Sequence, residues 1–265
     1  MSTSQQSADP PPLTLQVDDG VAVITLDRPS SFNAIDLGMA QAFASMVDAV
    51  AGDARVRAVL LRGAGRSFCA GGDVIAMHAH AHDLPGFVGQ VIDAFHVAVL
   101  AMARLPVPVL AAVQGAAAGG GFSLAMAADV VLAARSARFV VAYPQLGTST
   151  DGGLSWQLQQ RLGASRALAV LTLQGPLSAQ AAADLQLVHE VVDDEALQPE
   201  ALRRVQAWAA LPPQALRELK GLVRAPSIDS LAQQLAREKA AFLRCAATPD
   251  FAERVAAFAA RSASR

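Results

Sequence analysis

Charged side chains and cysteines are scarce in this sequence of 265 residues. The first scarcity argues against a strongly charged partner, and the second against a site built from cysteines. Only 17% of the residues are charged and the formal net charge is −2, which gives no electrostatic reason to expect nucleic acid or an anionic membrane as a partner. The two cysteines, Cys69 and Cys245, cannot build a disulfide framework or a zinc site of the usual spacing. We therefore expect a protein of the reducing cytoplasm without a metal site.

The N-terminal end lacks the features of a secretion signal. Residues 1–12 are polar, end in a run of prolines and contain neither a basic n-region nor an apolar h-region, so we expect a flexible lead-in. Hydrophobic residues, in contrast, make up 53% of the chain. That is enough for a sizeable buried core in one large domain, or in one domain with a small appendage.

One stretch without charged side chains, Leu105–Ala128, is long enough to suggest a membrane span. Pro106 and Pro108 interrupt its beginning, and the glycine triplet Gly119–Gly121 interrupts it further on. Proline and successive glycines both disfavour a continuous helix. We expect a strand, a tight turn and a buried helix here, and no contact with a membrane.

Short apolar runs alternate with longer amphipathic segments, a pattern typical of an α/β core. Apolar residues recur every three or four positions over 37–50 and 85–105, which predicts helices, and a small-residue helix is expected over 122–128. From about Ser178 onward the pattern is almost wholly helical, and Thr248 followed by Pro249 is typical of a helix start. The expected strands are 13–16, 21–26, 58–61, 109–113, 130–134 and 139–141.

Two glycine-rich turns stand out, one over Ser67–Asp73 and one over Gln114–Phe122. Each follows an expected strand and leads into an expected helix, so each exposes backbone N–H groups where the helix dipole adds positive potential. Two such N–H groups aimed at one point would form an oxyanion hole. Taken singly, either turn has a plainer interpretation, because glycine also permits tight turns and close packing.

Together the two turns resemble the signatures of the crotonase (enoyl-CoA hydratase/isomerase) superfamily. Two further stretches, Ile24–Ala34 and Phe139–Gly153, resemble that family in the same order and spacing. The resemblance extends from Leu13 to Phe258. It implies an α/β fold of the crotonase type, with a spiral of ββα units over 13–195 and a helical C-terminal trimerisation region over 196–265. It also implies a homotrimer or a homohexamer.

The resemblance further implies a substrate and the residues that hold it. Crotonase-like enzymes bind acyl-CoA thioesters, with coenzyme A as part of the substrate and without a permanently bound cofactor. The two backbone donors to the thioester oxygen correspond to Gly72 and Gly120. Coenzyme A would lie along Ala70, Gly72, Asp73 and Val74. Arg28 is a further candidate for coenzyme A, since Ser30 stands where many relatives have a lysine.

The sequence departs from the hydratase pattern at the acid/base positions. A hydratase of this family carries two glutamates that hold and activate a water molecule, and here those positions are Ser123 and Tyr143. The paired carboxylates for adding water are therefore missing. Asp151 matches an acidic position of several isomerases in the superfamily, including the phenylacetate-pathway ring isomerase. One carboxylate suffices for a double-bond shift, although an aspartate before Gly152 is also a common turn residue.

A second interpretation involves His96. In the related 4-chlorobenzoyl-CoA dehalogenase a histidine, a tryptophan and an aspartate occupy the positions of His96, Tyr143 and Asp151, and there the aspartate attacks the ring while the histidine activates water. The plainer interpretation of His96 is a packed histidine on a helix, and Tyr143 could simply wall the acyl pocket. A third possibility is a non-catalytic member that binds acyl-CoA, against which the retained turns and Asp151 argue.

The remaining candidates have structural interpretations. Asp73 is expected to fix its turn, and Cys69 to be a small packed residue without a partner base. The alternating histidines at positions 78, 80 and 82 are expected to lie in a solvated loop, because no acidic or cysteine cluster accompanies them. Gln186 stands where the family often has glycine.

Overall fold

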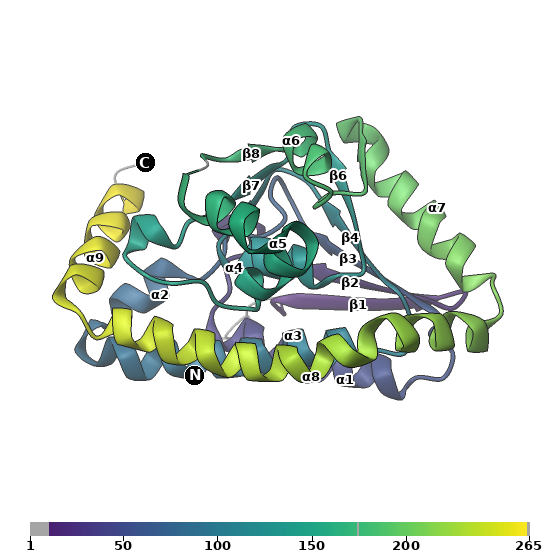
Figure 1. Ribbon diagram of the computed structural model, residues 1–265, viewed down its shortest axis with the longest axis horizontal. Helices are drawn as coiled ribbons and strands as arrows, with labels where there is room; N and C mark the ends of the chain where they lie inside the picture. The colour runs from purple at the N-terminus through teal and green to yellow at the C-terminus, as the bar shows by residue number, and fades with distance from the viewer. Residues whose placement is uncertain (1–10, 174, 264–265) are drawn as a thin grey trace, which may run out of the picture.

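A six-stranded sheet forms the centre of the computed structural model, which describes residues 11–173 and 175–263 (Figure 1). The strands follow the order β1-β2-β3-β4-β6-β9. The pair β1–β2 is antiparallel and every other neighbouring pair is parallel. The strands of this sheet are β1 (Leu13–Asp18), β2 (Val21–Leu26), β3 (Ala58–Gly63), β4 (Val109–Val113), β6 (Val130–Ala134) and β9 (Glu190–Val192).

A smaller sheet stands beside the first and brings the chain to the glycine-rich turns. It contains β5 (Ala116–Ala118), β7 (Arg138–Val140) and β8 (Leu177–Ser178), in that order. The chain alternates between the sheets, because β4 and β6 belong to the large one while β5 and β7 belong to the small one. This alternation is the expected spiral of repeated units.

Helices cover both faces of the large sheet (Figure 1). On one face α7 (Leu197–Ala209) buries its apolar stripe, including Leu197 and Val205, against Leu60 and Leu110 of the sheet. The opposite face belongs to the main core, where Phe43 and Val47 are among the buried residues. Around that core lie α1 (Leu37–Gly52), α3 (Leu84–Arg104), α4 (Gly120–Ala127), α5 (Leu154–Leu173) and α6 (Ala179–Asp184).

The C-terminal helices cross the molecule and return to the first glycine-rich turn. The long α8 (Pro213–Ala246) runs beside α3, and α9 (Pro249–Ala263) packs against α2 (Val74–Ala79) (Figure 1). The helix start expected at Thr248 and Pro249 is confirmed, because the Thr248 hydroxyl accepts a hydrogen bond from the Phe251 amide at 3.3 Å. This return of the chain places α9 over the site described below.

The uncharged stretch Leu105–Ala128 forms the expected strand, β4, and the expected buried helix, α4, with an additional short strand, β5, between them. A different segment, Ala81–Arg104, is the one helix among the described residues that is long and apolar enough to cross a membrane. Its buried residues pack within the core, and α3 contacts both α1 and α8. Packing against other helices accounts for its apolar composition.

Two expectations from the sequence are wrong. The region after Ser178 is not wholly helical, because Glu190–Val192 forms β9 and pairs with β6 at the end of the large sheet. A strand of three residues is too short for apolar periodicity to reveal it. The segment with alternating histidines is not a loop, since α2 extends through His78 and a 3₁₀ turn covers Ala81–Asp83. All three histidines are nevertheless exposed, as expected.

Candidate active site

The two glycine-rich turns lie directly against each other. The Cys69 amide donates to the Ala116 carbonyl at 3.1 Å, and the Ala118 amide donates to the Cys69 carbonyl at 2.9 Å. A Cβ atom at Gly71 would stand 2.6 Å from the Ala118 oxygen, and one at Gly121 would stand 2.1 Å from the Cys69 oxygen. Both approaches are closer than side chains permit, so glycine is required for the turns to meet.

The backbone amides of Gly72 and Gly120 are the two candidate donors of an oxyanion hole. Both residues line one cavity of about 480 Å³. Within the described part of the chain, neither amide donates a hydrogen bond to another residue. Gly120 is the first residue of α4, where an N–H group has no partner inside the helix and the helix dipole adds positive potential.

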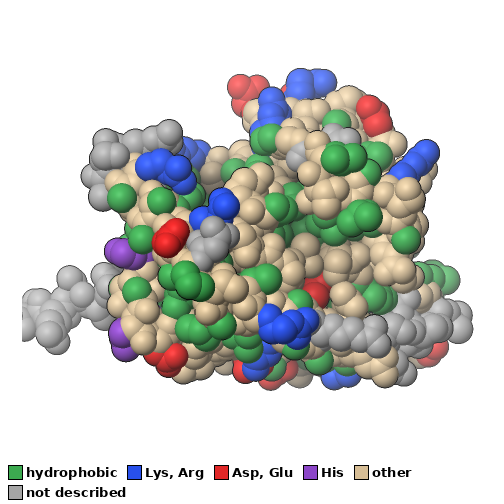
Figure 2. All heavy atoms as spheres, turned by 60° about the vertical axis from the view of Figure 1, so that its left-hand side comes forward, with side chains coloured by type: hydrophobic (Ala, Val, Ile, Leu, Met, Phe, Trp, Pro, Cys, Tyr) green, Lys and Arg blue, Asp and Glu red, His purple; other side chains and the backbone are tan. Residues whose placement is uncertain are grey.

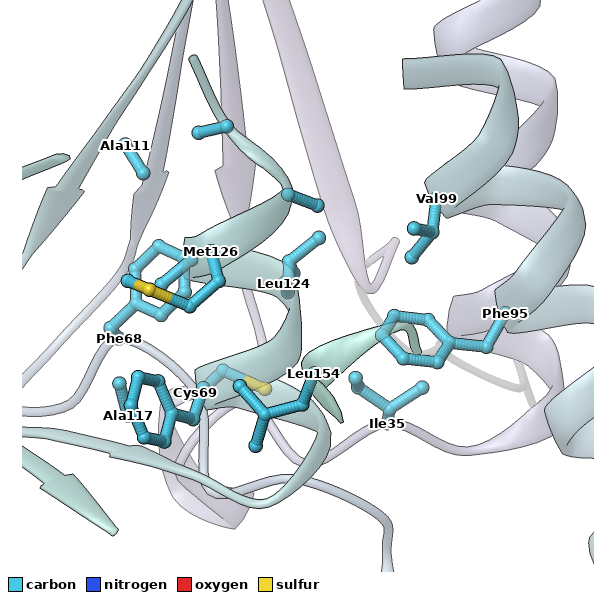
Figure 3. Packing of buried hydrophobic residues seen from close by; sticks show 14 of the residues in the cluster. Ile35, Phe68, Cys69, Phe95, Val99, Ala111, Ala117, Leu124, Met126 and Leu154 are labelled. Atoms are coloured by element: carbon cyan, nitrogen blue, oxygen red, sulfur yellow. The ribbon is translucent and has the colours of Figure 1, made fainter. Parts of the chain in front are cut away.

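Asp151 lines the same cavity. A Cβ atom built on Gly120 would lie 3.8 Å from Asp151 Oδ1, and 3.5 Å from Ile35 Cδ1, so the carboxyl group stands beside the second amide. Figure 3 shows Ile35 and Phe95 pointing toward each other in this apolar surrounding. Burial raises the pKa of Asp151 to about 7; a hydrogen bond from Tyr143 opposes this rise and the charge of Glu238 adds to it.

The two positions at which hydratases carry glutamate form a hydroxyl pair next to Asp151. Tyr143 Oη donates to Asp151 Oδ1 at 2.5 Å, and Ser123 Oγ lies 2.7 Å from Tyr143 Oη. Burial, followed by the charge of Asp151, raises the pKa of Tyr143 well above its ordinary value. Tyr143 therefore stays protonated at neutral pH, and Asp151 is the carboxyl group of this cluster.

His96 contacts the residue that follows Asp151 in the chain. It is buried on α3, and its Nε2 atom accepts a hydrogen bond from the Gly152 amide at 3.1 Å. Burial lowers the pKa of His96 to about 4, so the ring is neutral at physiological pH. The described residues that line the cavity do not include His96.

Glu238 is a residue of this site that the sequence reasoning missed. It lies on α8, is buried, and accepts hydrogen bonds from the Gly153 amide at 2.7 Å, from Thr150 Oγ1 at 3.3 Å and from the Ser155 hydroxyl. Its separation from the Asp151 loop by more than eighty positions left no local signal. A glutamate inside a long helix is ordinarily a solvated residue.

Comparison with known proteins agrees with this geometry. The family model described as enoyl-CoA hydratase/isomerase matches residues 16–264. This chain belongs to the enoyl-CoA hydratase/isomerase family. It is 35% identical to 1,2-epoxyphenylacetyl-CoA isomerase of Escherichia coli (strain K12), over 92% of this chain and 94% of that protein. It is also 35% identical to a probable enoyl-CoA hydratase of Rhodobacter capsulatus, over 92% of this chain and 93% of the relative.

Solved structures show the same fold. An enoyl-CoA hydratase from Mycobacterium avium subsp. paratuberculosis K-10 superposes with a TM-score of 0.85 at 30% identity, covering 94% of this chain and 99% of that one. The α/β crotonase fold expected from the two turns is thereby confirmed. Since relatives of equal identity are named as isomerase and as hydratase, the reaction has to be argued from the site itself.

A second hollow adjoins the first at the residues where this family is expected to hold coenzyme A. It measures about 610 Å³, its lining includes Arg28, Asp73 and Val74, and it shares Ala70 and Gly72 with the first cavity. The five residues expected from the resemblance thus lie together around one hollow.

Arg28 and Asp73 also hold the turn itself. Arg28 pairs with Asp73 at 3.1 Å and with Asp36 at 3.0 Å. The Asp73 carboxylate accepts the Ala76 amide at 3.0 Å and so caps α2, as expected for a turn-fixing residue. Arg28 therefore faces the hollow as part of an ion-pair network.

The remaining residues that the sequence singled out do not line the first cavity. Cys69 is fully buried, and burial raises the pKa of its thiol to about 12, which fits a packed residue. No group of three or more His, Cys, Asp and Glu among the described residues could hold a metal ion.

Basic and acidic side chains are scattered over the face in Figure 2, without a broad patch of one sign.

Proposed function

We propose that this family member isomerises an acyl-CoA thioester, by a double-bond shift or a ring isomerisation, with Asp151 as the acid/base. One observation carries the proposal: a single carboxyl group of raised proton affinity stands beside two backbone amides that lack partners among the described residues. In the proposed reaction the Asp151 carboxylate removes a proton from a carbon activated by the thioester. Gly72 and Gly120 hold the enolate oxygen, and Asp151 then returns the proton to a different carbon.

The hydroxyl pair favours isomerisation over hydration. Adding water requires one group to take a proton from the water and another to supply a proton to the substrate. Ser123 and Tyr143 cannot act as a second carboxylate, whereas isomerisation returns the same proton through one group. In this proposal the Tyr143 hydroxyl holds Asp151 in one orientation through its hydrogen bond at 2.5 Å. The Tyr143 side chain also forms part of the wall of the acyl pocket.

The proposed substrate binds across both hollows. The coenzyme A portion lies along Ala70, Gly72, Asp73 and Val74, with Arg28 at its edge, and the acyl group enters the cavity beside Asp151. Coenzyme A is then part of the substrate, and the proposed chemistry calls for neither a permanent cofactor nor a metal. We expect the enzyme to work in the cytoplasm, where its free cysteines stay reduced, without nucleic acid or membrane as a partner.

A hydrolytic reaction of the dehalogenase type is the second candidate, because Asp151 and His96 both stand near the cavity. It has weaker support, since the Nε2 atom that would take a proton from water already accepts the Gly152 amide. A non-catalytic member that only binds acyl-CoA remains the third candidate. The raised proton affinity of Asp151 beside the two amides argues for chemistry rather than binding alone.

We also propose a homotrimer or homohexamer, with the helical region 196–265 as its main contact surface and residues 13–195 as the catalytic core. Exposed apolar side chains on two C-terminal helices support this assignment, because water-exposed apolar area favours association. Among them are Leu202 and Leu219, 39% and 60% exposed. The lead-in expected over residues 1–12 falls almost entirely outside the described residues.

Turnover of a panel of acyl-CoA thioesters tests the reaction. The panel contains 3-enoyl-, 2-enoyl-, ring-epoxide phenylacetyl- and 4-chlorobenzoyl-CoA, assayed with the wild type, with Asp151→Asn and with Asp48→Asn, a control at an exposed aspartate. We expect the wild type to catalyse one positional or ring isomerisation. Its rate should be at least about 10²-fold lower in Asp151→Asn and unchanged in Asp48→Asn. Rapid water addition, chloride release that depends on His96, or tight binding without any turnover would each overturn the proposal.

A further inference from the structure

Two consecutive left-handed glycines follow Asp151 and shape the loop that carries it. Gly152 has a φ of +58° and Gly153 a φ of +83°. A Cβ atom at Gly152 would stand 2.5 Å from the Phe95 ring and 2.8 Å from Ser123 Cβ, so only glycine fits there. The amides of Gly152 and Gly153 have no backbone acceptor among the described residues, and glycine can adopt many alternative backbone conformations. The position of Asp151 therefore depends on what holds these two amides.

Two buried side chains from different helices hold them, one each. His96 on α3 accepts the Gly152 amide through Nε2 at 3.1 Å. Glu238 on α8 accepts the Gly153 amide at 2.7 Å. Glu238 also accepts the hydroxyl of Thr150, which precedes Asp151, and that of Ser155. These hydrogen bonds thus fix the backbone on both sides of Asp151.

The two helices are themselves tied at this level. Lys239, next to Glu238, forms an ion pair with Asp93, which lies one turn before His96 on α3. Gln234, one turn before Glu238 on α8, donates to Ser155 Oγ at 2.8 Å. The exposed ion pair thus joins the two helices at the surface, and the buried hydrogen bonds tie both helices to the Asp151 loop.

We propose that His96 and Glu238 are positioning residues that clamp the Asp151 loop and hold its carboxyl group at the cavity that Gly72 and Gly120 also line. This inference rests on the proposed role of Asp151 and assigns a task to two residues that do not touch the substrate. A misplacement of about 1 Å at a reacting group can cost on the order of 10²-fold in rate, which sets the size of the effect. His96 acts through its unprotonated Nε2 and transfers no proton.

Glu238 has an electrostatic effect on Asp151 in addition. The ionisable groups around Asp151 are Tyr143, which bonds to it, His96 on α3, Glu238 on α8 and Cys69 in the first turn. Arg254 and Arg261 of α9 line the same cavity. Within this set Glu238 is the acidic group whose charge adds to the rise of the Asp151 pKa. Removing that charge should shift the pH profile to lower pH.

Paired substitutions separate positioning from chemistry. His96→Gln places an amide oxygen where Nε2 stands and keeps an acceptor for Gly152, whereas His96→Leu removes it. We expect kcat to fall about 10²-fold in His96→Leu and by less than about 10-fold in His96→Gln, with KM little changed in both. Equal loss in the two variants would overturn the proposal, because a histidine that moves protons cannot be replaced by glutamine. Full activity in His96→Leu would overturn it as well.

The same design applies to Glu238. Glu238→Gln keeps an acceptor for Gly153 and loses the charge, so we expect near-normal kcat with the pH midpoint of kcat/KM moved to lower pH. Glu238→Leu should lose about 10²-fold in kcat. Undiminished kcat in Glu238→Leu would contradict the clamp, and an unmoved midpoint in Glu238→Gln would contradict the electrostatic effect of Glu238 on Asp151. Should a leucine variant fail to fold, a loss of about 10²-fold in kcat in the matching glutamine variant would still contradict the clamp.

A measurement without substrate distinguishes failure of the clamp from failure of the proposed reaction. In protein labelled with ¹⁵N only at glycine, hydrogen exchange of the Gly152 and Gly153 amides reports each hydrogen bond directly. We expect His96→Leu to lose protection at Gly152, Glu238→Leu to lose it at Gly153, and the glutamine variants to keep both. Protection unaffected by either leucine substitution would overturn the clamp, even if the isomerase activity is found. Loss of protection as expected would support the clamp even if the reaction proves different.

Discussion

At the scale of single residues, the raised proton affinity of Asp151 links activity to stability. The pKa of this carboxyl group is 3.8 in a model compound and about 7 in the folded protein, chiefly because of burial. Between these two values the native state holds a proton that the unfolded chain has released. The unfolded state thus binds fewer protons, and the contribution of Asp151 to the free energy of unfolding falls as the pH rises through this window.

Asp151→Asn should therefore gain stability relative to the wild type as the pH rises. We expect the difference in free energy of unfolding, variant minus wild type, to increase by about 1–3 kcal/mol from pH 5 to pH 8. This is less than the full pKa shift would give, because the carboxyl group faces a cavity open to water. Urea unfolding at both pH values measures it. A difference that stays constant with pH, as expected for the control Asp48→Asn, would contradict a raised Asp151 pKa.

Gln186 offers a second prediction at this scale. Its φ of +61° lies in the left-handed region, and its amide donates to the Ala183 carbonyl at 2.8 Å, so the turn after α6 fixes this conformation. A side chain costs roughly 1–2 kcal/mol there, and the greater flexibility of unfolded glycine offsets roughly half of that.

Gln186→Gly should raise the free energy of unfolding by about 0.5–1 kcal/mol. The matched control is Gln180→Gly on the exposed face of α6, which should lower it by about 1 kcal/mol because glycine disfavours helix. Urea unfolding of the two variants gives opposite signs if the conformation at 186 is left-handed. Destabilisation by both substitutions would show that it is not.

At the scale of elements, the contact between the two glycine-rich turns creates the proposed oxyanion hole. Gly71 has a φ of +92°, and a Cβ atom there would stand 2.6 Å from the Ala118 oxygen and 3.2 Å from the Gly120 nitrogen. Gly71→Ala should therefore push the turns apart. We expect a loss of about 1–3 kcal/mol in stability and of at least about 10²-fold in kcat.

Thermal unfolding and turnover of Gly71→Ala measure these two losses together. The control is Gly52→Ala at the end of α1, where a Cβ atom would meet nothing within 4 Å and no loss is expected. A Gly71→Ala variant with wild-type turnover would mean that the turns need no close contact.

The turns were predictable from the sequence, because glycine in series between a strand and a helix is a local pattern. The proposed role of Asp151 rests on the family resemblance, since an aspartate before two glycines is also an ordinary turn residue. Glu238 and strand β9 were missed for different physical reasons. Glu238 reaches the site through tertiary packing over a long stretch of chain, and β9 is too short to show periodicity.

At the scale of the whole molecule, the site is assembled from the full length of the chain. The first turn, the second turn and the Asp151 loop come from the spiral core, whereas Glu238 and the wall that includes Phe258 come from the C-terminal helices. The helical region therefore completes the candidate site, in addition to its proposed role as a contact surface. Contacts of α8 with a neighbouring subunit would then bear on the helix that holds Glu238.

The exposed apolar side chains of α8 lead to the last prediction. Leu219 and Val223 are 60% and 75% exposed and border a hollow of about 430 Å³ together with Trp156. Burial of apolar area contributes roughly 25 cal/mol per Å², so two such side chains add appreciably to association.

The double variant Leu219→Glu, Val223→Glu places charges in that contact and should shift the protein toward monomers in sedimentation velocity. Gln41→Glu, on the exposed face of α1, is the control and should leave assembly unchanged. Equal association of all three proteins would assign the subunit contact to another surface.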